Sequence, residues 1–481
     1  MKSWKGSLAI SLLPLTLFTL ANDSRAVDGW ESQAALTVRT VVSDNIHLSD
    51  DDKDSDINFR ITPSIGLSKD GRYNRVRFNY GLSFQKYLDE AADEDLKHDL
   101  TASWHSELYR DLFYLDVNAN AGQSLISNSG PGTGDDINTT GNTTQTYTYS
   151  ISPYIRRSLG SVAELELRFK HDEVIHDNAA SRDSSSQMFQ LDLSSGRDFQ
   201  KIGWNIDGSA KRVKRDGSGS DDKYRKIRAE ISYALNSNWR PHLYVGYEDN
   251  DFTTNTDTPR DSIYGAGVTW TPGPRTTLRL EYGHRFYGRD GSFSLSHRQR
   301  RSVLTASFSR DITSSREELL QRQTFVLVDA FGNPVANPAL AVGAIALDSP
   351  DLSNDIYILD SFRLGYTVQM GRRDTVDLSA HHSRRDNQRT GGEETRWGLG
   401  ANWSHSFTAN LSGKLNLSWE TADEGTGSGD DDRWSLGLGV VQKLSERTSF
   451  SFDLRHANRD SSTPGSDYSE NRATLTLSTS W

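Results

Sequence analysis

A two-residue alternation of apolar and polar side chains runs through most of this sequence. Residues 57–67 place isoleucine, phenylalanine, proline and leucine at every second position, and residues 76–84 repeat the pattern with valine, phenylalanine, tyrosine and leucine. The stretches 227–235, 397–403 and 434–440 do the same. Successive side chains of a strand point to opposite sides of a sheet, so this period gives each segment one apolar face. The sequence therefore predicts a chain built mainly of strands.

The connections between these segments alternate in length. Short connections lie at 271–276, 371–374, 407–410 and 444–448, and long ones at 49–56, 122–145, 248–262, 384–394, 421–432 and 458–470. A strand of about 10 residues crosses a bilayer when it is tilted by about 45°. Outer-membrane barrels join such strands by short periplasmic turns and long extracellular loops. We therefore predict an all-β fold, an antiparallel up-and-down transmembrane β-barrel. A soluble β-sandwich, propeller or solenoid is the competing architecture, and it explains the regular alternation of loop lengths less well.

The C-terminal residue gives a starting point for counting the strands. If this end lies in the periplasm, every long connection falls outside the cell and the count reaches 22 strands. Residues 293–308 contain no glycine or proline, yet their apolar positions change parity. We interpret this change as a tight turn, although a β-bulge in one strand would have the same effect. The prediction is a barrel of about 20–22 strands.

Composition agrees with a barrel and excludes several other classes. The chain has 481 residues, a formal net charge of −11, 35% hydrophobic residues and no cysteine. Its mean hydropathy of −0.66 is too polar for a helical membrane protein, but only every second residue of a barrel strand faces lipid. The negative charge argues against a nucleic-acid partner. The lack of cysteine excludes disulfides and thiol chemistry.

The first 26 residues have the features of a secretory signal peptide. Lys2 and Lys5 precede an apolar stretch at 8–21, and small residues lie near Ala26. We expect cleavage near Ala26 and export in a Gram-negative bacterium. Residues 27–481 would then form the barrel in the cell outer membrane, in contact with lipid and lipopolysaccharide.

The longest insert, residues 311–355, differs in composition from the other loops. Residues 314–323 predict a short helix in which Ser315 is the N-cap and Glu318 lies three residues later. The stretches that follow are apolar enough to require burial. Two interpretations stay open: the insert folds into the barrel mouth as a constriction or plug or packs on a partner, or it is a lid that merely packs on the rim.

No motif for catalysis, cofactor binding or metal binding is found in the sequence. Neither G-x-S-x-G nor H-E-x-x-H occurs. His381 and His382 are adjacent, so on a strand their rings would point in opposite directions. We expect no enzyme activity and no cofactor. An outer-membrane hydrolase with residues contributed by several strands is the less favoured alternative.

The polar parity of the strands carries many charged side chains. The candidate lumen-facing arginines are Arg60, Arg75, Arg77, Arg168, Arg228, Arg279 and Arg285. Inside a barrel such charges are tolerated when they are hydrated or paired. One interpretation is a water-filled conduit for a polar solute. The other, favoured for any individual arginine, is an arginine–carboxylate lattice that stiffens the wall.

The last ten residues alternate regularly and end on an aromatic side chain. Leu475, Leu477 and Trp481 share one parity. This pattern resembles the signal that the outer-membrane assembly machinery reads, which makes that machinery an expected partner. The last strand must also pair with the first, because an open sheet edge is not tolerated in lipid.

Residues 265–288 and 293–320 carry a family resemblance. The cues are W-T-P-x-P-R-T at 270–276, G-x-R-F-Y-G at 283–288 and S-H-R-x-R-R at 296–301. The chain resembles the outer-membrane β-barrel proteins associated with the PEP-CTERM/exosortase system, which are encoded near exopolysaccharide genes. The resemblance implies a role in exopolysaccharide export or assembly, with exopolysaccharide and periplasmic export components as partners. It implies no catalytic residues.

The function expected from the sequence is a porin-like conduit for exopolysaccharide. The first alternative is a non-transporting outer-membrane scaffold for the assembly of surface or PEP-CTERM proteins. Neither the polymer nor the role of the insert is identified by the sequence.

Overall fold

The computed structural model describes residues 29–89, 96–128, 130–132, 137–177, 182–217, 220–255, 259–322, 352–353, 355–423, 425 and 430–481. The predicted signal peptide lies outside these residues. So does most of the insert at 311–355, including both of its long apolar stretches.

The described residues form 22 strands and one short helix. The strands are β1 (Trp30–Ser43), β2 (Asp56–Asp70), β3 (Asn74–Tyr87), β4 (Leu96–Tyr109), β5 (Phe113–Leu125), β6 (Thr143–Leu159), β7 (Ala163–His176), β8 (Ser184–Ser195), β9 (Ile202–Arg215), β10 (Asp222–Tyr233), β11 (Trp239–Asp251), β12 (Arg260–Gly273), β13 (Thr276–Arg285), β14 (Gly288–Arg298), β15 (Ser302–Ser314), β16 (Ile356–Met370), β17 (Asp374–Asn387), β18 (Glu393–Ser406), β19 (Leu411–Asp423), β20 (Asp430–Lys443), β21 (Thr448–Ser461) and β22 (Tyr468–Ser480). The helix is α1 (Ser315–Arg322).

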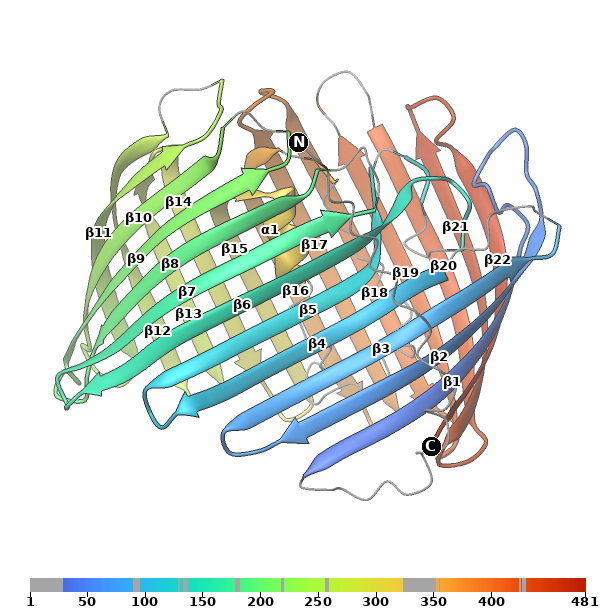
Figure 1. The fold of residues 1–481 in the computed structure, drawn as a ribbon, viewed down its shortest axis with the longest axis horizontal. Helices are drawn as coiled ribbons and strands as arrows, with labels where there is room; N and C mark the ends of the chain where they lie inside the picture. Colours follow the sequence, from blue (N-terminus) through green and yellow to red (C-terminus); the bar gives the residue numbers. More distant parts are fainter. Residues whose placement is uncertain are drawn as a thin grey trace, which may run out of the picture.

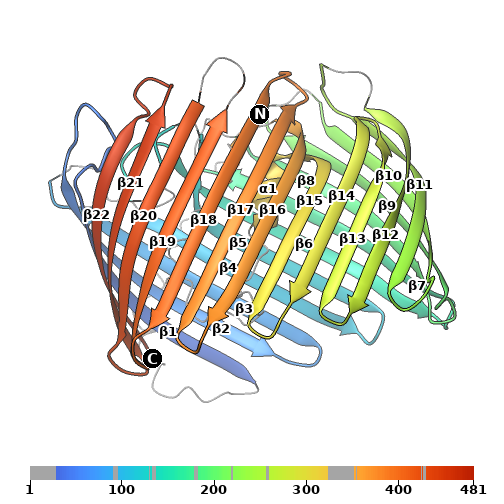
Figure 2. The same ribbon diagram turned by 180° about the vertical axis from the view of Figure 1, so that it is seen from behind.

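Every strand pairs antiparallel with its neighbours in the sequence, and β1 also pairs with β22. The sheet therefore closes into a barrel of tilted strands (Figures 1 and 2). Short connections such as 371–373 lie at one end, here called the turn end, and long ones such as 44–55 at the other, the loop end. This arrangement confirms the predicted antiparallel up-and-down barrel.

The uncertain segment at 293–308 is a tight turn. β14 ends at Arg298, β15 begins at Ser302, and the two pair antiparallel with Phe293 opposite Phe308. The parity changes because three residues form the turn between two strands. The strand count of 22 is therefore confirmed, and the counts of 20 and 21 are wrong.

The outward face of the wall is apolar. Leu243, Val245 and Tyr282 are each more than 60% exposed, and the polar side chains of the same strands point inward. No helix among the described residues is long and apolar enough to cross a membrane. An exposed apolar band on a closed barrel fits a lipid bilayer, because a closed sheet leaves no strand edge unpaired in lipid.

The C-terminal residue is fixed at the barrel seam. The Trp481 amide donates to the Ala34 carbonyl oxygen at 3.0 Å, and the Ala34 amide donates to the Trp481 oxygen at 3.1 Å. Leu475 and Leu477 point outward opposite Thr40 and Val38 of β1. The pairing explains why the chain end is held in place. The role of these side chains in assembly stays a prediction.

The helix predicted within the insert is present, but its cap was assigned wrongly. Ser315 is the first helical residue, and the Ser314 hydroxyl accepts a hydrogen bond from the Glu317 amide at 3.4 Å. β15 pairs with β16 as far as Ser314 opposite Ile356. The chain therefore passes directly from the strand into the helix, which moves the cap back by one residue.

Candidate functional site

The inner face of the barrel wall is lined with charged side chains. Three of the arginines identified from the sequence lie on β2 and β3. Arg60 is buried and donates to the Gln85 side-chain oxygen at 2.8 Å. Arg75 and Arg77 both contact Asp70 at the turn end, at 3.2 Å, and are exposed to solvent. Exposed ion pairs of this kind contribute little to stability.

Arg168 and Arg285 each contact side chains on two other strands and so join three strands. Arg168 donates to Asp116 at 2.7 Å and to Glu166 at 3.0 Å, and its guanidinium lies 3.8 Å from the Tyr154 ring centre.

Arg285 is buried between strands β11 and β15. It contacts Glu248 at 2.8 Å and Asp311 at 2.7 Å. These contacts are those of an internal lattice that ties neighbouring strands together, because each guanidinium binds two carboxylates in a bidentate or bridging way.

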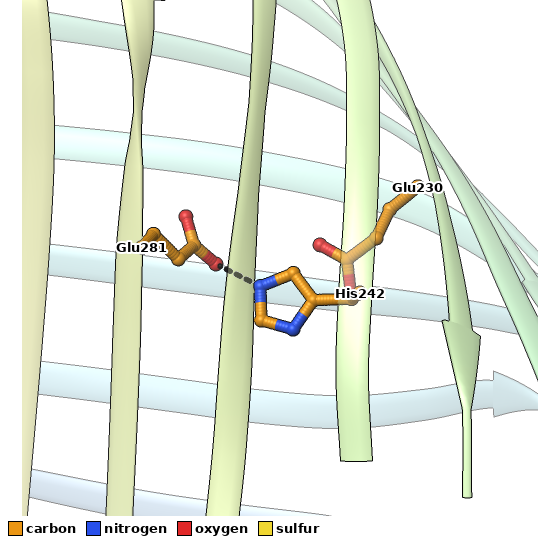
Figure 3. Close-up of side chains that lie close together, drawn as sticks. All are labelled: Glu230, His242 and Glu281. Atoms are coloured by element: carbon orange, nitrogen blue, oxygen red, sulfur yellow. Dashed lines mark hydrogen bonds and ion pairs between the residues drawn. The ribbon is translucent and has the colours of Figure 1, made fainter.

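The remaining two arginines belong to a cluster on β10, β11 and β13. Glu230, His242 and Glu281 point toward one another from these strands, and His242 Nε2 lies 3.2 Å from Glu281 Oε1 (Figure 3). Ligand atoms of the three lie within 4.8 Å of one another, a spacing that a metal ion could bridge.

Arg228 and Arg279 make this cluster a poor metal site. Both contact Glu230 and Glu281, at distances between 2.5 and 3.3 Å. Two guanidinium charges repel a divalent cation and already occupy the carboxylate oxygens. The cluster is better described as a neutral ion-pair lattice.

Glycine on the intervening strand allows His242 to reach Glu281. A Cβ atom at Gly267 would lie 2.3 Å from His242 Nε2 and 2.4 Å from the Leu280 carbonyl oxygen. The same arrangement recurs where His381 lies across Gly398, 3.8 Å from Glu420. His382 points the other way and stacks on Trp397, with ring centres 4.0 Å apart. The opposite orientation of the two histidines agrees with the strand alternation.

The described residues of the β5–β6 connection (126–128, 130–132 and 137–142), here called the mouth loop, contact the inner face of β20–β22. The Arg459 guanidinium donates to the Gly130 carbonyl oxygen at 2.5 Å, and the Tyr468 hydroxyl donates to the Gly132 carbonyl oxygen at 3.0 Å. Arg433 donates to the Asn128 carbonyl oxygen. On β3, the Tyr87 hydroxyl donates to the Ile137 carbonyl oxygen at 2.6 Å. The wall therefore holds this loop through its backbone.

Helix α1 lies in the barrel toward the loop end (Figures 1 and 2). Arg316 donates to the Ser184 hydroxyl on β8 at 2.9 Å and pairs with Asp172 on β7. Glu317 pairs with Lys211 on β9.

On its other side α1 contacts β17. Arg385 donates to Glu318 Oε2 at 3.2 Å. β8 and β17 are nine strands apart in a ring of 22 (17 − 8 = 9). The helix thus connects distant parts of the wall across the lumen. Whether the insert forms a constriction or a lid stays a prediction.

Charge rather than apolar packing fixes the first turn of α1. Arg316 and Asp172 are both buried, at 5% and 4% side-chain exposure. Burial alone would raise the pKa of the Glu317 carboxyl, but the ion pairs with Lys211 and Arg316 lower this pKa to about 2. Glu317 therefore stays ionised at any physiological pH.

The end of the insert meets both elements. The Leu352 amide donates to the Ile126 carbonyl oxygen of the mouth loop at 2.9 Å. The Ser353 and Ser315 hydroxyls lie 3.0 Å apart. The two structures that enter the mouth are therefore in contact through the returning chain.

Sequence reasoning did not identify the residues that hold α1. Asp172, Lys211 and Arg385 lie on strands rich in similar charges, and each is at least 67 residues from its partner on the helix. Only the helix itself left a local signal. The pairing depends on which strands the closed barrel brings near residue 315.

One group of side chains in the described loops partly resembles the hydroxyl, histidine and acid of a hydrolase site. The Thr139 hydroxyl lies 3.0 Å from His47 Nδ1, and His47 Nε2 lies 3.6 Å from Asp54. The second distance is too long for a hydrogen bond. A base that is not oriented by its acid does not activate a hydroxyl, so this arrangement does not favour catalysis.

Comparison with known proteins agrees with the barrel. Residues 383–480 match the model of a family described as "Putative beta-barrel porin 2". This segment covers 98 of the 481 residues (480 − 383 + 1), about a fifth of the chain. No curated protein matches the sequence.

Several solved structures resemble the whole barrel. A mutant of the ferric enterobactin receptor PfeA from Pseudomonas aeruginosa has a TM-score of 0.53 at 11% identity, covering 94% of this chain and 80% of that chain. The FrpB iron transporter from Neisseria meningitidis has a TM-score of 0.51 at 9% identity, with coverages of 94% and 83%. At such low identity the similarity shows the fold alone. The chain has the closed antiparallel β-barrel fold that these structures share.

Proposed function

We propose that this protein is a gated, water-filled conduit of the outer membrane and that its solute is an exopolysaccharide. The observation that supports this proposal most directly is α1, a helix held across the lumen by ion pairs to β7, β9 and β17. A helix held there would control passage through the barrel if the lumen conducts.

The size and lining of the barrel support a conduit. A ring of 22 strands encloses more space than inward side chains alone can fill. The inner wall carries both signs of charge in paired form, which keeps it compatible with water. A hydrated polymer could move along such a wall by diffusion, driven by its synthesis in the periplasm.

Release of α1 would open the conduit. Separating the buried pair Arg316–Asp172 without a replacement costs about 3–5 kcal/mol. The gate is therefore closed by default, and opening it requires a partner or solute that takes over these charges.

The choice of exopolysaccharide rests on the sequence resemblance at 265–320 to exosortase-associated barrel proteins. The alternative from the same resemblance is a scaffold for surface or PEP-CTERM protein assembly that transports nothing. A scaffold has no need of a lumen that can open, so conductance separates the two.

Conductance in planar bilayers tests the conduit. We expect the purified full-length chain to show low conductance and a variant lacking residues 316–350 to show large, stable steps. A variant lacking residues 426–429, which lie outside the described residues, serves as a deletion control and should behave like the parent. If the 316–350 deletion inserts into the bilayer and stays non-conducting, the conduit proposal is wrong and the scaffold is favoured.

The polymer is tested in cells. A strain lacking the protein should accumulate exopolysaccharide in the periplasm, and the full-length gene should restore secretion. Normal secretion in that strain would contradict exopolysaccharide as the solute without affecting the conductance result.

A further inference from the structure

The wall beneath α1 carries a strip of cationic side chains. The five cations are Lys170 on β7, Lys211 and Arg215 on β9, Arg316 on α1 and Arg389 in the β17–β18 connection. Lys211 and Arg215 share the inner parity of β9 and lie four residues apart. At ~3.3 Å per residue the strip extends about 13 Å along this strand.

These five cations share only three carboxylates among the described residues. Asp172 accepts from Arg316 and lies 3.7 Å from Lys170. Glu317 contacts Lys211 and lies 3.0 Å from Arg316.

The third carboxylate is Asp222. It pairs with Arg215 and lies 3.2 Å from Arg389. Five positive and three negative charges leave the strip with two excess positive charges (5 − 3 = 2). In a lumen away from bulk water, unbalanced like charges are costly unless an anion joins them.

Two of the cations are open to a ligand. The Lys170 side chain is 34% exposed and that of Arg389 is 25% exposed, whereas Arg215 and Arg316 are buried. Arg389 Nε is buried and has no hydrogen-bond partner among the described residues. An N–H group in that state has the capacity to donate to an incoming oxygen.

Tyr224 supplies an aromatic surface within the strip. It lies opposite Lys211 in the β9–β10 pairing, and the Lys211 ammonium is 5.7 Å from its ring centre. A ring beside several cations suits a ligand that has both apolar ring faces and acidic groups, as an acidic sugar does.

We propose that this strip is a binding site for an anionic oligosaccharide, whose carboxylates bind Lys170 and Arg389 and compete with Glu317 and Asp172 for the cations that hold α1. The inference rests on the proposed conduit and specifies the charge of its solute. The length of about 13 Å fits several linked sugars better than a single phosphate. By taking over the cations that Glu317 and Asp172 contact, the solute would release α1 and open the lumen to itself.

Binding to the purified full-length barrel is measured by titration calorimetry with tri-galacturonic acid. We expect binding that weakens with salt, and maltotriose, which is neutral, should not bind. Lys170→Gln and Arg389→Gln should each weaken binding roughly tenfold, the equivalent of ~1.4 kcal/mol. Lys170 and Arg389 pair with Asp172 and Asp222 and, among the described residues, form no ion pair with α1, so these variants leave the pairs Lys211–Glu317 and Arg316–Asp172 in place.

Arg212→Gln is the matched control. Arg212 follows Lys211 on β9 but has the opposite parity and pairs with Asp221. This variant should bind tri-galacturonic acid as the parent does. Equal weakening by all three variants, equal affinity for maltotriose, or tighter binding of inorganic phosphate alone would each overturn the site.

A conductance measurement separates this inference from the conduit. Tri-galacturonic acid added on the loop side should raise the conductance of the parent and have less effect on Arg389→Gln. Calorimetric binding with a barrel that never conducts would leave the site in place and contradict the conduit. If the 316–350 deletion conducts but the full-length barrel does not bind the trimer, the conduit is supported and the binding site is contradicted.

Discussion

The mouth loop and α1 both enter the lumen at the loop end, but the wall holds them by different chemistry. The mouth loop is held through its backbone, by donors such as Arg459 and Tyr468 that reach its carbonyl oxygens. Helix α1 is held through its own charged side chains, by Arg316 and Glu317. The position of a loop bound by its backbone depends little on its sequence. The position of the helix depends on the three consecutive charges Arg316, Glu317 and Glu318.

The difference predicts different responses to charge. Arg459 and Arg433, which donate to the loop carbonyl oxygens, are already paired with Asp431, so the mouth loop should stay in place when a charged solute enters. The α1 contacts are exchangeable, because an anion that binds Lys211 or Arg316 replaces the contact it breaks. We therefore infer that the loop is a fixed part of the mouth and that α1 is the movable part.

Asp172→Asn should have the largest effect on this contrast. It removes the charge that neutralises buried Arg316, and the cost to α1 docking should be about 3–5 kcal/mol. Hydrogen exchange of residues 315–322 should increase sharply, while exchange of the mouth loop stays unchanged. Asp70→Asn, at an exposed pair of the turn end, is the control and should alter neither.

Glu317→Gln should loosen α1 less. It keeps the shape of the side chain but loses the charge-assisted contacts to Lys211 and Arg316, with a cost of about 1.5–3 kcal/mol. Channel opening frequency in planar bilayers should lie between those of the parent and Asp172→Asn. An opening frequency equal to that of the parent would show that Glu317 does not hold the helix.

The pH dependence of α1 docking follows from the same carboxyl. The pKa of Glu317 is lowered from 4.5 to about 2, so its contribution is fully present above pH 4.5 and is lost as the pH falls through about 2. The difference in opening frequency between the parent and Glu317→Gln should be constant from pH 8 to about 5. A difference that disappears near pH 6 would contradict the low pKa.

Tyr468→Phe tests the mouth loop with a smaller expected effect. It removes one hydroxyl donor to the Gly132 carbonyl oxygen, which costs about 1 kcal/mol. Hydrogen exchange of residues 126–132 should rise modestly and that of α1 should not. If α1 loosens as well, the two elements are coupled through Leu352 and the contrast between them fails.

Arg77→Gln gives the smallest expected effect. Its contact with Asp70 is exposed at the turn end, far from both elements, and contributes less than about 1 kcal/mol. Thermal unfolding and conductance should match the parent within error. A clear change in conductance would place a second constriction at the turn end.

The sequence was sufficient to predict the wall of this barrel. Alternation is a relation between residues two apart, so it identifies the outward face of each strand, as at Leu243 and Val245, wherever the strand lies. Loop lengths and the C-terminal strand then gave the count of 22. The turn at 299–301 was predicted correctly, and the cap of α1 was misplaced by one residue because strand pairing extends to Ser314.

The tertiary structure alone decided what occupies the lumen. Many arginines and carboxylates share the inward parity, and the sequence does not say which pairs come within 4 Å. Arg316 and Asp172 are 144 residues apart and meet because barrel closure brings β7 near the end of β15. Side-chain direction is a local property of a strand, whereas contact across a lumen depends on the closure and tilt of the whole sheet.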